Sequence, residues 1–275
     1  MATTNNVLSS LPRLLGLIAL AAATGAMAAP SVQLEDLTWV ELRERVAAGA
    51  TTALVPIGGT EQNGPHMVLG KHNQRVRLLA QRIAEKLGNA LVAPVLAYVP
   101  EGAIEPPTQH MRWPGTITVP VAAFEATLES AARSLRRAGF CQVVFLGDHG
   151  GYRSSLERVA GKFNREPAAA GGCRVHALPE YYRAASDDYA KALAARGHSA
   201  AEIGTHAGLA DTSLMLALDP AFVRADALGG TKGKDGVAGD PARASAELGR
   251  PGVEHIVDSS VAAIRKLTPS KVSPP

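Results

Sequence analysis

The chain has little cysteine and little unbalanced charge, and both shortages exclude classes of protein. Its two cysteines, Cys141 and Cys173, are too few to define a disulfide scaffold. The formal net charge is only +3, and no basic run or basic-aromatic pattern occurs, which argues against a nucleic-acid partner. Each cysteine opens an expected strand. The pair could form a disulfide or stay as two small buried thiols, and the sequence leaves both open.

Several catalytic motifs are also missing. The chain has no G-x-x-x-x-G-K-[ST] phosphate loop, and residues 147–151 (GDHGG) match neither that loop nor a dinucleotide fingerprint. No G-x-S-x-G turn supplies a serine nucleophile, and neither cysteine has a context typical of a reactive thiolate. Water activated by a metal ion is therefore the most economical chemistry, because it needs no protein nucleophile.

Apolar runs approaching the length of a membrane span are absent after the N-terminal segment. In that segment, residues 1–13 carry one positive charge, residues 14–23 are apolar, and residues 26–28 (AMA) fit a cleavage site. The apolar run is shorter than the about 20 residues that cross a bilayer. We therefore expect a secretory signal peptide over residues 1–28, with an uncleaved anchor as the alternative. The mature protein would be periplasmic or secreted and would not contact the membrane.

The mature chain, residues 29–275, has the length of one large α/β domain. Its apolar patterns alternate between those of strands and those of helices, which indicates a mostly parallel sheet covered by helices on both faces. The expected strands are 53–57, 91–99, 116–119, 141–146 and 173–178. The expected helices are 34–48, 74–87, 120–138, 151–163, 187–195, 203–218 and 254–267, with Trp39, Leu42 and Val46 on the apolar face of the first. Loops are expected at 101–115 and 229–239, and a frayed tail at 268–275.

Potential metal ligands follow two of these strands. Glu61, His66 and His72 come after the strand at 53–57, and Asp148 and His149 follow the strand at 141–146. In parallel sheets, functional sites lie beyond the carboxyl ends of the strands, so these loops should meet. Each residue alone has a bland explanation. Glu61 could cap a helix or pair with Arg75 or Lys71, and the histidines could be solvated or pack in their loops. Together, a carboxylate and imidazoles at equivalent strand ends indicate one metal site.

A third stretch, residues 205–213, places His206 and Asp211 near the start of an apolar helix. Asp211 could simply cap that helix. In a functional interpretation it is a ligand or proton acceptor, and His206 is a proton donor.

These stretches resemble the motifs of the creatininase (creatinine amidohydrolase) family. Residues 61–72 resemble E-x-H-G-P-H-x-P-x-G-x-D, and residues 147–151 resemble N-G-H-G-G. Further matches in order are 110–116 to H-x-x-F-P-G-T, 206–213 to H-A-G-E-x-E-T-S, and 236–249 to the C-terminal G-V-x-G-D-P region. The resemblance implies a three-layer α/β/α fold, a homo-oligomer, and metal-dependent hydrolysis of C–N bonds in small or cyclic amides.

The chain departs from the family pattern at two ligand positions. Asn63 stands in place of the E-x-H histidine, and His72 stands in place of the aspartate that bridges two ions. A neutral imidazole offers one lone pair and cannot bridge two cations, and an amide is a poor zinc ligand. We therefore expect one divalent ion rather than two, held by Glu61, His72 and His149. Zinc is the first expectation, with manganese or iron as alternatives.

The remaining site residues receive roles within this expectation. Asp211 or Asp148 would accept the proton of the attacking water, and His206 would pass one to the leaving nitrogen. Trp113, Asn63 and His66 are assigned to substrate binding, with ordinary packing as the alternative for Trp113 and His66. Two rival functions remain: a non-catalytic exported protein that binds a metal or small ligand, and a peptidase-like relative. The substrate need not be creatinine.

Overall fold

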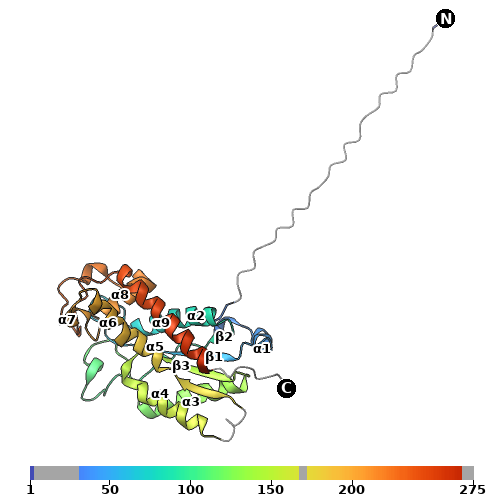
Figure 1. The fold of residues 1–275 in the computed structure, drawn as a ribbon, viewed down its shortest axis with the longest axis horizontal. Helices are drawn as coiled ribbons and strands as arrows, with labels where there is room; N and C mark the ends of the chain where they lie inside the picture. Colours follow the sequence, from blue (N-terminus) through green and yellow to red (C-terminus); the bar gives the residue numbers. More distant parts are fainter. Residues whose placement is uncertain (3–30, 167–171, 268–275) are drawn as a thin grey trace. The chain divides into compact units, whose positions relative to one another are not determined.

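A four-stranded parallel sheet forms the centre of the fold. The computed structural model describes residues 1–2, 31–166 and 172–267, so the expected signal peptide and the expected tail at 268–275 lie outside the described residues, apart from the first two positions. The strands lie in the order β2-β1-β3-β4 (Figure 1). Their bounds are β1 Thr52–Ile57, β2 Ala90–Val92, β3 Gln142–Gly147 and β4 Arg174–Ala177.

The two central strands bury side chains on both faces. In β3, Val143 and Phe145 point into one core, whereas Val144 and Leu146 point into the other. This division follows the two-residue period of a strand, and it explains why β1 and β3 are apolar without a polar alternation. Both strands are buried along their whole length. The expected α/β fold with a parallel sheet covered on both faces is confirmed.

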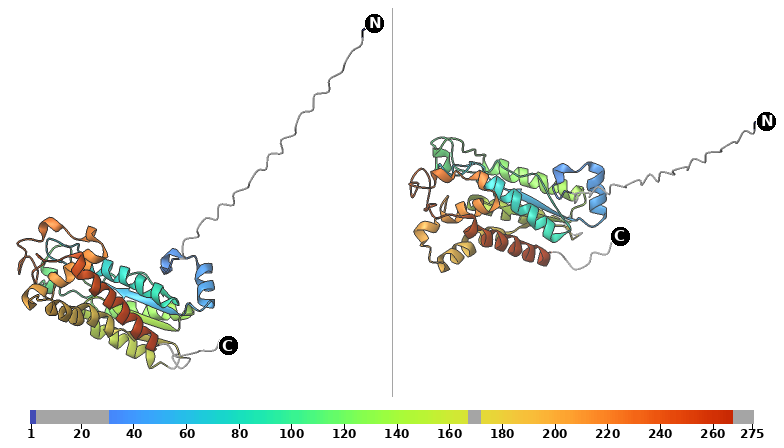
Figure 2. Two further views of the ribbon diagram at one scale, coloured as in Figure 1. Left: turned by 45° about the horizontal axis from the view of Figure 1, so that its top comes forward. Right: turned by 90° about the horizontal axis from the view of Figure 1, so that it is seen from above.

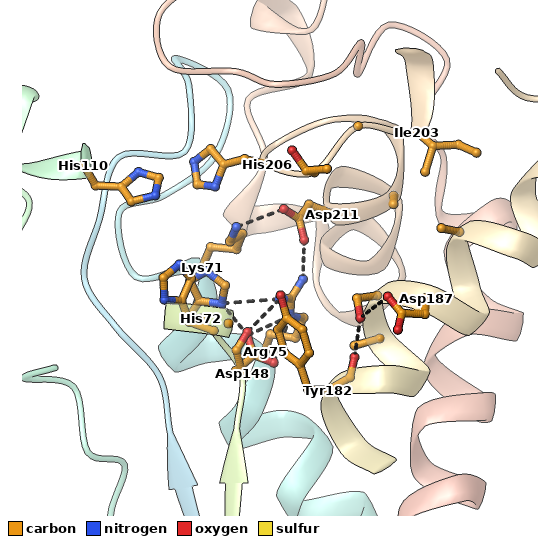
Figure 3. A pocket seen from close by; sticks show the side chains of 18 residues that line it. Lys71, His72, Arg75, His110, Asp148, Tyr182, Asp187, Ile203, His206 and Asp211 are labelled. Atoms are coloured by element: carbon orange, nitrogen blue, oxygen red, sulfur yellow. Dashed lines mark hydrogen bonds and ion pairs between the residues drawn. The ribbon is translucent and has the colours of Figure 1, made fainter. Parts of the chain in front are cut away.

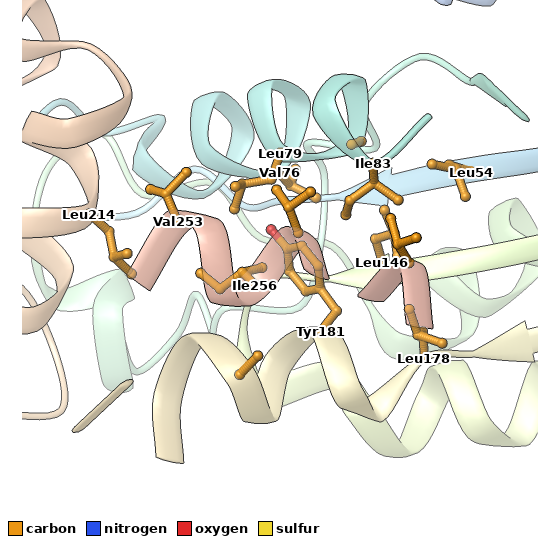
Figure 4. Close-up of a cluster of buried hydrophobic side chains, with 14 of the residues drawn as sticks. Leu54, Val76, Leu79, Ile83, Leu146, Leu178, Tyr181, Leu214, Val253 and Ile256 are labelled. Carbon is orange, nitrogen blue, oxygen red and sulfur yellow. The ribbon is translucent and has the colours of Figure 1, made fainter. Parts of the chain in front are cut away.

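Helices cover each face of the sheet (Figures 1 and 2). On one face, α2 (Lys71–Leu87) and α9 (Ala246–Leu267) pack with the core that contains Val144 and Leu146 (Figure 4). On the other face, α3 (Val121–Arg137) and α4 (Arg153–Asn164) enclose the other core. Helix α2 buries Val76, Leu79 and Ile83 at helical spacing, and it ends where Gly88 adopts the left-handed conformation, with φ of 79°.

Shorter elements complete the described chain. A capping box at Thr38 begins α1, which spans Trp39–Ala47. After β4 come α5 (Pro179–Arg183), a π-helical turn (Ala184–Asp188), α6 (Tyr189–Ala195), α7 (Ala200–Ile203) and α8 (Leu209–Leu218). The 3-10 turns are Leu34–Asp36, Gln109–Arg112, Gly150–Tyr152, Pro220–Phe222 and Ala225–Ala227.

Two of the expected strands are shorter in the structure, and both differences have local causes. The segment 91–99 is a ladder strand only to Val92, because Pro94 has no N–H to donate. The segment 116–119 makes one isolated bridge, between Ile117 and Thr60. The hydroxyl of Thr118 accepts a hydrogen bond from the Glu101 N–H at 2.9 Å, so this segment supports a loop instead of a sheet.

Three expected helices also need correction. The helix expected over 203–218 begins only at Leu209, as α8, and Ile203 is the last residue of the separate helix α7. Between them, the N–H groups of Thr205 and His206 donate to the Ala238 carbonyl. The last helix begins at Ala246 and continues through Pro251. The expected apolar face of α1 does not include Trp39, whose side chain is 73% exposed.

The start of α2 matters most for the site. This helix begins at Lys71 rather than near Gln74, so His72 lies in its first turn and not on the preceding loop. Lys71 and His72 are adjacent, and Arg75 follows them by four and three positions. This spacing brings the three side chains together at the buried start of the helix.

The two cysteines form a disulfide. Cys141 precedes β3 and Cys173 precedes β4, so the bond joins the beginnings of two neighbouring parallel strands. The Arg174 N–H also donates to the Cys141 carbonyl at 2.8 Å. Of the two alternatives that the sequence left open, the structure has the disulfide. Among the described residues, no helix combines the length and apolarity needed to cross a membrane.

Candidate metal centre and active site

The loop after β1 turns Glu61 into the protein interior. Its N–H donates to the Leu69 carbonyl at 3.1 Å, and the Asn63 side-chain amide donates to the carbonyls of Glu61 and Val68 at 2.9 and 3.2 Å. These bonds close the loop on itself, and the Glu61 side chain is fully buried. Asn63 therefore holds the loop in shape, a role that suits an amide better than metal binding does.

The loop after β3 is fixed to β1 through one tyrosine hydroxyl. Tyr152 is buried, and its Oη accepts hydrogen bonds from the N–H groups of Asp148 and His149 at 3.2 and 3.1 Å. The same oxygen lies 2.7 Å from the carbonyl oxygens of Ile57 and Gly58, which share its single hydroxyl proton. Tyr152 thereby holds the His149 loop at a set position beside the end of β1.

Four side chains at these strand ends form a compact group of donors. Glu61, Glu101, His110 and His149 each offer one donor atom, and these atoms all lie within 4.8 Å of one another. Three carboxyl oxygens in the group, Glu61 Oε2 and both oxygens of Glu101, are buried without a hydrogen-bond partner. Buried carboxyl oxygens are normally paired, so this group has the chemistry of a cation site.

The backbone leaves room for Glu101 beside this group. Gly59 has φ of 153°, and a Cβ added there would lie 2.5 Å from Glu101 Oε1. A residue with a side chain at position 59 would push Glu101 away. Two carboxylates and two imidazoles form a mixed oxygen and nitrogen set, which suits zinc, manganese or iron.

Burial sets the protonation of the donor group. Burial and the neighbouring Glu61 charge raise the pKa of Glu101 to about 9, so this carboxyl is neutral at pH 7 without a cation. Burial would also raise the pKa of Glu61, but His72 and Lys71 outweigh it and hold that pKa far below its usual range. Burial lowers the pKa of His149 to about 4, which leaves its imidazole neutral and able to donate a lone pair.

A closed ring of acidic and basic side chains lies beside the donor group, and Figure 3 shows the part of it that runs from His72 to Lys71 through Asp148, Arg75 and Asp211. His72 contacts Glu61 Oε1 through Nε2 at 2.8 Å and Asp148 Oδ2 through Nδ1 at 2.6 Å. Arg75 then joins Asp148 to Asp211, at 2.9 and 2.6 Å. Lys71 Nζ closes the ring, 3.0 Å from Asp211 Oδ2 and 3.7 Å from Glu61 Oε1. Burial would raise the pKa of Asp211, but Lys71 and Arg75 hold it well below its usual range.

Gln62 arranges two further histidines above the ring. Its side-chain oxygen accepts from the Gly64 N–H, and its amide nitrogen lies 3.2 Å from the Gly236 carbonyl and 3.1 Å from His110 Nδ1. His206 Nε2 lies 2.9 Å from the Gln62 backbone carbonyl and 3.1 Å from the Gln62 amide nitrogen. We assign the tautomer in which Nε2 carries the proton and donates to the nearer carbonyl. A neutral His206 then keeps its lone pair on Nδ1, and burial lowers the pKa of this histidine to about 3.

A cavity of about 500 Å³ opens beside these groups. Its walls include Lys71, His72, Arg75, His110, Asp148, His149, His206 and Asp211 (Figure 3). Tyr182 and the π-helical turn at 184–188 form another part of the wall. The volume suits a small organic ligand.

The six metal and catalytic residues expected from the sequence lie close together, in different roles. Glu61 and His149 belong to the donor group, whereas both nitrogens of His72 are already hydrogen-bonded to carboxylates. Asp148 is buried, and its oxygens bond to Arg75, His72 and Tyr181. The negative charges of Asp148 and Asp211 are thus balanced by neighbouring basic side chains. His206, in contrast, lines the cavity with one ring nitrogen available for proton transfer.

The three residues assigned to substrate binding do not line this cavity. Asn63 and His66 are fully buried, and His66 Nε2 lies 3.0 Å from the Thr212 hydroxyl. Trp113 is half-buried at the end of the 3-10 turn Gln109–Arg112. Asn63 and His66 therefore support the structure of the site and do not line its cavity.

Sequence reasoning missed Glu101, and it placed His110 in a motif without a role. It considered Lys71 and Arg75 only as ion-pair partners of Glu61, and the Lys71–Glu61 pair is present at 3.7 Å. Glu101 follows the apolar segment 91–99, and thus stands after a strand like Glu61 does, which was the available signal. Lys71 and Arg75 gave no such signal. Lysine and arginine are rarely buried, and only the early start of α2 brings them inside.

The fold and the donor group define the class of a metal-dependent hydrolase with a parallel α/β sheet. The family model described as creatininase, creatinine amidohydrolase, matches residues 35–264, and the chain belongs to that family. The family places it among the metal-dependent amidohydrolases.

Individual relatives support this assignment. A creatinine amidohydrolase of Pseudomonas putida is 32% identical over 200 residues, covering 71% of this chain and 75% of that protein. A mycofactocin precursor peptide peptidase of Mycolicibacterium smegmatis is 26% identical, covering 79% and 86%. A crystal structure of creatininase matches with a TM-score of 0.74 and 27% identity, over 88% of this chain and all of that one. Other matching creatininase structures are described as a manganese form and a Zn–Zn form.

Proposed function

We propose that this protein hydrolyses C–N bonds of small amides or cyclic amides at a single divalent metal ion. The observation that carries the proposal is the buried donor group, in which Glu61 Oε2 and both Glu101 oxygens have no hydrogen-bond partner. A cation bound by the group would supply the positive charge that these buried carboxyl groups lack. Family membership supports the reaction class, and the cavity beside the group supports a small substrate.

The residues that would hold the ion are Glu61, Glu101, His110 and His149. This set keeps Glu61 and His149 from the sequence-based expectation and replaces His72. When bound, a zinc, manganese or iron ion would act as a Lewis acid on the substrate carbonyl and make a water molecule more acidic. Glu101 would release its proton as the ion binds, because the ion supplies the positive charge that the isolated site lacks.

His206 is the best-placed group to move a proton. Its Nε2 donates to the Gln62 carbonyl, so Nδ1 can accept the proton of the attacking water and then pass it to the leaving nitrogen. Asp148 and Asp211 are less suited to this step, because their oxygens are already held by other side chains. Asp148 bonds to Arg75, His72 and Tyr181, and Asp211 bonds to Arg75 and Lys71. We assign them to positioning His72, Arg75 and Lys71.

The test combines metal analysis with an activity screen. The purified mature chain should contain about one ion and hydrolyse a member of a panel of creatinine, other cyclic amides and small linear amides. His149→Ala should lose both the ion and the activity, whereas His255→Ala, at an exposed position on α9, should keep both. A chain without a bound ion and without activity towards the whole panel would refute the proposal.

Peptides are the second candidate substrates. The mycofactocin precursor peptide peptidases support this alternative, with alignments that cover 78–79% of this chain. The same screen should include short peptides with free and blocked ends. Faster turnover of peptides than of cyclic amides would favour the peptidase.

We also propose that the protein is exported and forms a homo-oligomer. The N-terminal pattern of residues 1–28 supports export, and so does the Cys141–Cys173 disulfide, because such bonds persist in oxidising compartments. N-terminal sequencing of the protein from a periplasmic or secreted fraction tests cleavage near Ala28. Light scattering on the mature chain tests the oligomer, and a monomer would contradict it.

A further inference from the structure

A buried lysine ammonium shares its carboxylate with the proposed metal site. Lys71 is 1% exposed, and its Nζ lies 3.0 Å from Asp211 Oδ2 and 3.7 Å from Glu61 Oε1. Burying an ammonium group is costly unless anions surround it, so the position is built around this charge. The two carboxylates come from distant parts of the chain, the loop after β1 and helix α8.

The Glu61 carboxylate faces a different partner with each oxygen. Oε1 contacts His72 Nε2 and lies near Lys71 Nζ, whereas Oε2 lies 3.2 Å from His110 Nε2 and 3.8 Å from His149 Nε2. Oε1 therefore belongs to the ring of acidic and basic side chains, and Oε2 belongs to the donor group. A cation in the donor group and the ammonium of Lys71 would lie on either side of the same carboxylate.

Among the described residues, Lys71 is the cationic side chain that pairs with both Glu61 Oε1 and Asp211 Oδ2. His206 Nδ1 also lies 3.7 Å from Glu61 Oε1, and the Ala207 N–H donates to Asp211 Oδ2 at 2.9 Å. Arg75 contacts Asp211 through the other carboxyl oxygen, Oδ1, and its Nε is directed to Asp148. His72 uses both ring nitrogens on Glu61 and Asp148. The space between Glu61 Oε1 and Asp211 Oδ2 thus holds the ammonium of Lys71. Figure 3 shows its contact with Asp211.

We propose that Lys71 is a resident cation that limits the site to one divalent ion. The inference rests on the proposed metal-dependent function. The ammonium fills the position between Glu61 and Asp211 where two carboxylates could otherwise bind a second ion. It also repels the ion on the far side of Glu61, so the chain binds its single metal less tightly than the donor set alone would allow.

Three substitutions of Lys71 separate charge from volume. Lys71→Met keeps most of the volume without the charge, and it should bind one ion with a Kd lower by roughly tenfold or more, because repulsion across Glu61 is lost. Lys71→Ala removes both the charge and the volume, and this variant should bind two ions. Lys71→Arg keeps the charge and should bind one ion with a Kd close to that of the wild type.

The measurement is a titration of the metal-free mature chain with Zn²⁺ and with Mn²⁺ against a competing chelator, with elemental analysis of the loaded protein. Lys86→Met, an exposed lysine on the same helix, is the matched control and should not change the Kd. Thermal melting establishes that each variant is folded. If Lys71→Ala does not fold, the comparison of Lys71→Met with Lys71→Arg still decides.

The possible outcomes are distinct. One ion in the wild type, together with tighter binding in Lys71→Met but not in Lys71→Arg, supports the inference. Two ions in the wild type, or an unchanged Kd in Lys71→Met, would overturn it while leaving the proposed hydrolase intact. No ion in the wild type would instead overturn the proposed function, and the inference with it.

Discussion

Glu101 places a carboxyl oxygen within 4.8 Å of a carboxyl oxygen of Glu61, and neither oxygen of Glu101 has a hydrogen-bond partner. Two buried acids so close together cannot both be ionised without a cation, and the pKa of Glu101 is accordingly raised by burial and by Glu61 to about 9. The pair is stable in its ionised form only when a positive charge is supplied.

Glu101→Gln should therefore weaken metal binding by at least about tenfold, because it removes an anionic donor from the group. A competition titration with a chelator measures the Kd. Glu105→Gln, an exposed acid on the same loop, is the control and should bind as the wild type does. If Glu101→Gln keeps the wild-type Kd, Glu101 is not a ligand.

Tyr152→Phe should destabilise the protein by about 1–3 kcal/mol, because it leaves the N–H groups of Asp148 and His149 without their buried acceptor. Activity should fall as well, since the His149 loop loses its connection to the carbonyls after β1. Urea denaturation measures the free energy of unfolding. Tyr98→Phe changes an exposed tyrosine and should have little effect. Equal stability of both variants would show that the Tyr152 hydroxyl does not hold the loop.

The sequence predicted the sheet better than the site. Apolar runs at β1 and β3 are long and buried on both faces, so their position follows from composition alone. The structure places Glu61 Oε2 3.8 Å from His149 Nε2, and their binding of a metal ion stays a prediction. His72 was expected on the loop after β1, but helix α2 starts at Lys71 without a side-chain cap, so the usual sequence signal of a helix start was missing.

The residues that complete the site depend on contacts that local patterns do not encode. Lys71 reads as a surface lysine until Asp211, 140 positions later, is known to face it. Glu101 was hidden in a segment rich in proline and glycine, and only its hydrogen bond to Thr118 and the space left by Gly59 direct it inward. Long-range charge pairing and the space beside a glycine are properties of the folded chain.

Acidic pH should destabilise the metal-free protein partly through His206. Burial lowers the pKa of His206 to about 3, whereas in the unfolded chain it is about 6.5. A lowered folded pKa gives stability that is present above pH 6.5 and is lost as the pH falls, because the unfolded chain binds the proton first. From pH 6.5 to pH 5 this histidine should cost about 1.5–2 kcal/mol.

Urea denaturation in the presence of a chelator, at several values of pH, measures this dependence. His206→Gln cannot take up the proton, and its unfolding free energy should fall less steeply than that of the wild type over the same range. Parallel curves for the two proteins would mean that His206 does not titrate differently in the folded state.

Loss of the Cys141–Cys173 disulfide should lower stability by about 3–4 kcal/mol, because the bond closes a loop with a sequence separation of 32 and restricts the unfolded chain. The Cys141→Ala, Cys173→Ala double variant should show this loss in urea denaturation, and a reducing agent should produce a similar loss in the wild type. The reducing agent should leave the double variant unchanged. The bond lies at the beginnings of β3 and β4, whereas the donor group lies beyond the other ends of the strands. Metal content should therefore survive reduction under conditions where the chain stays folded, and loss of the ion on reduction alone would contradict this separation.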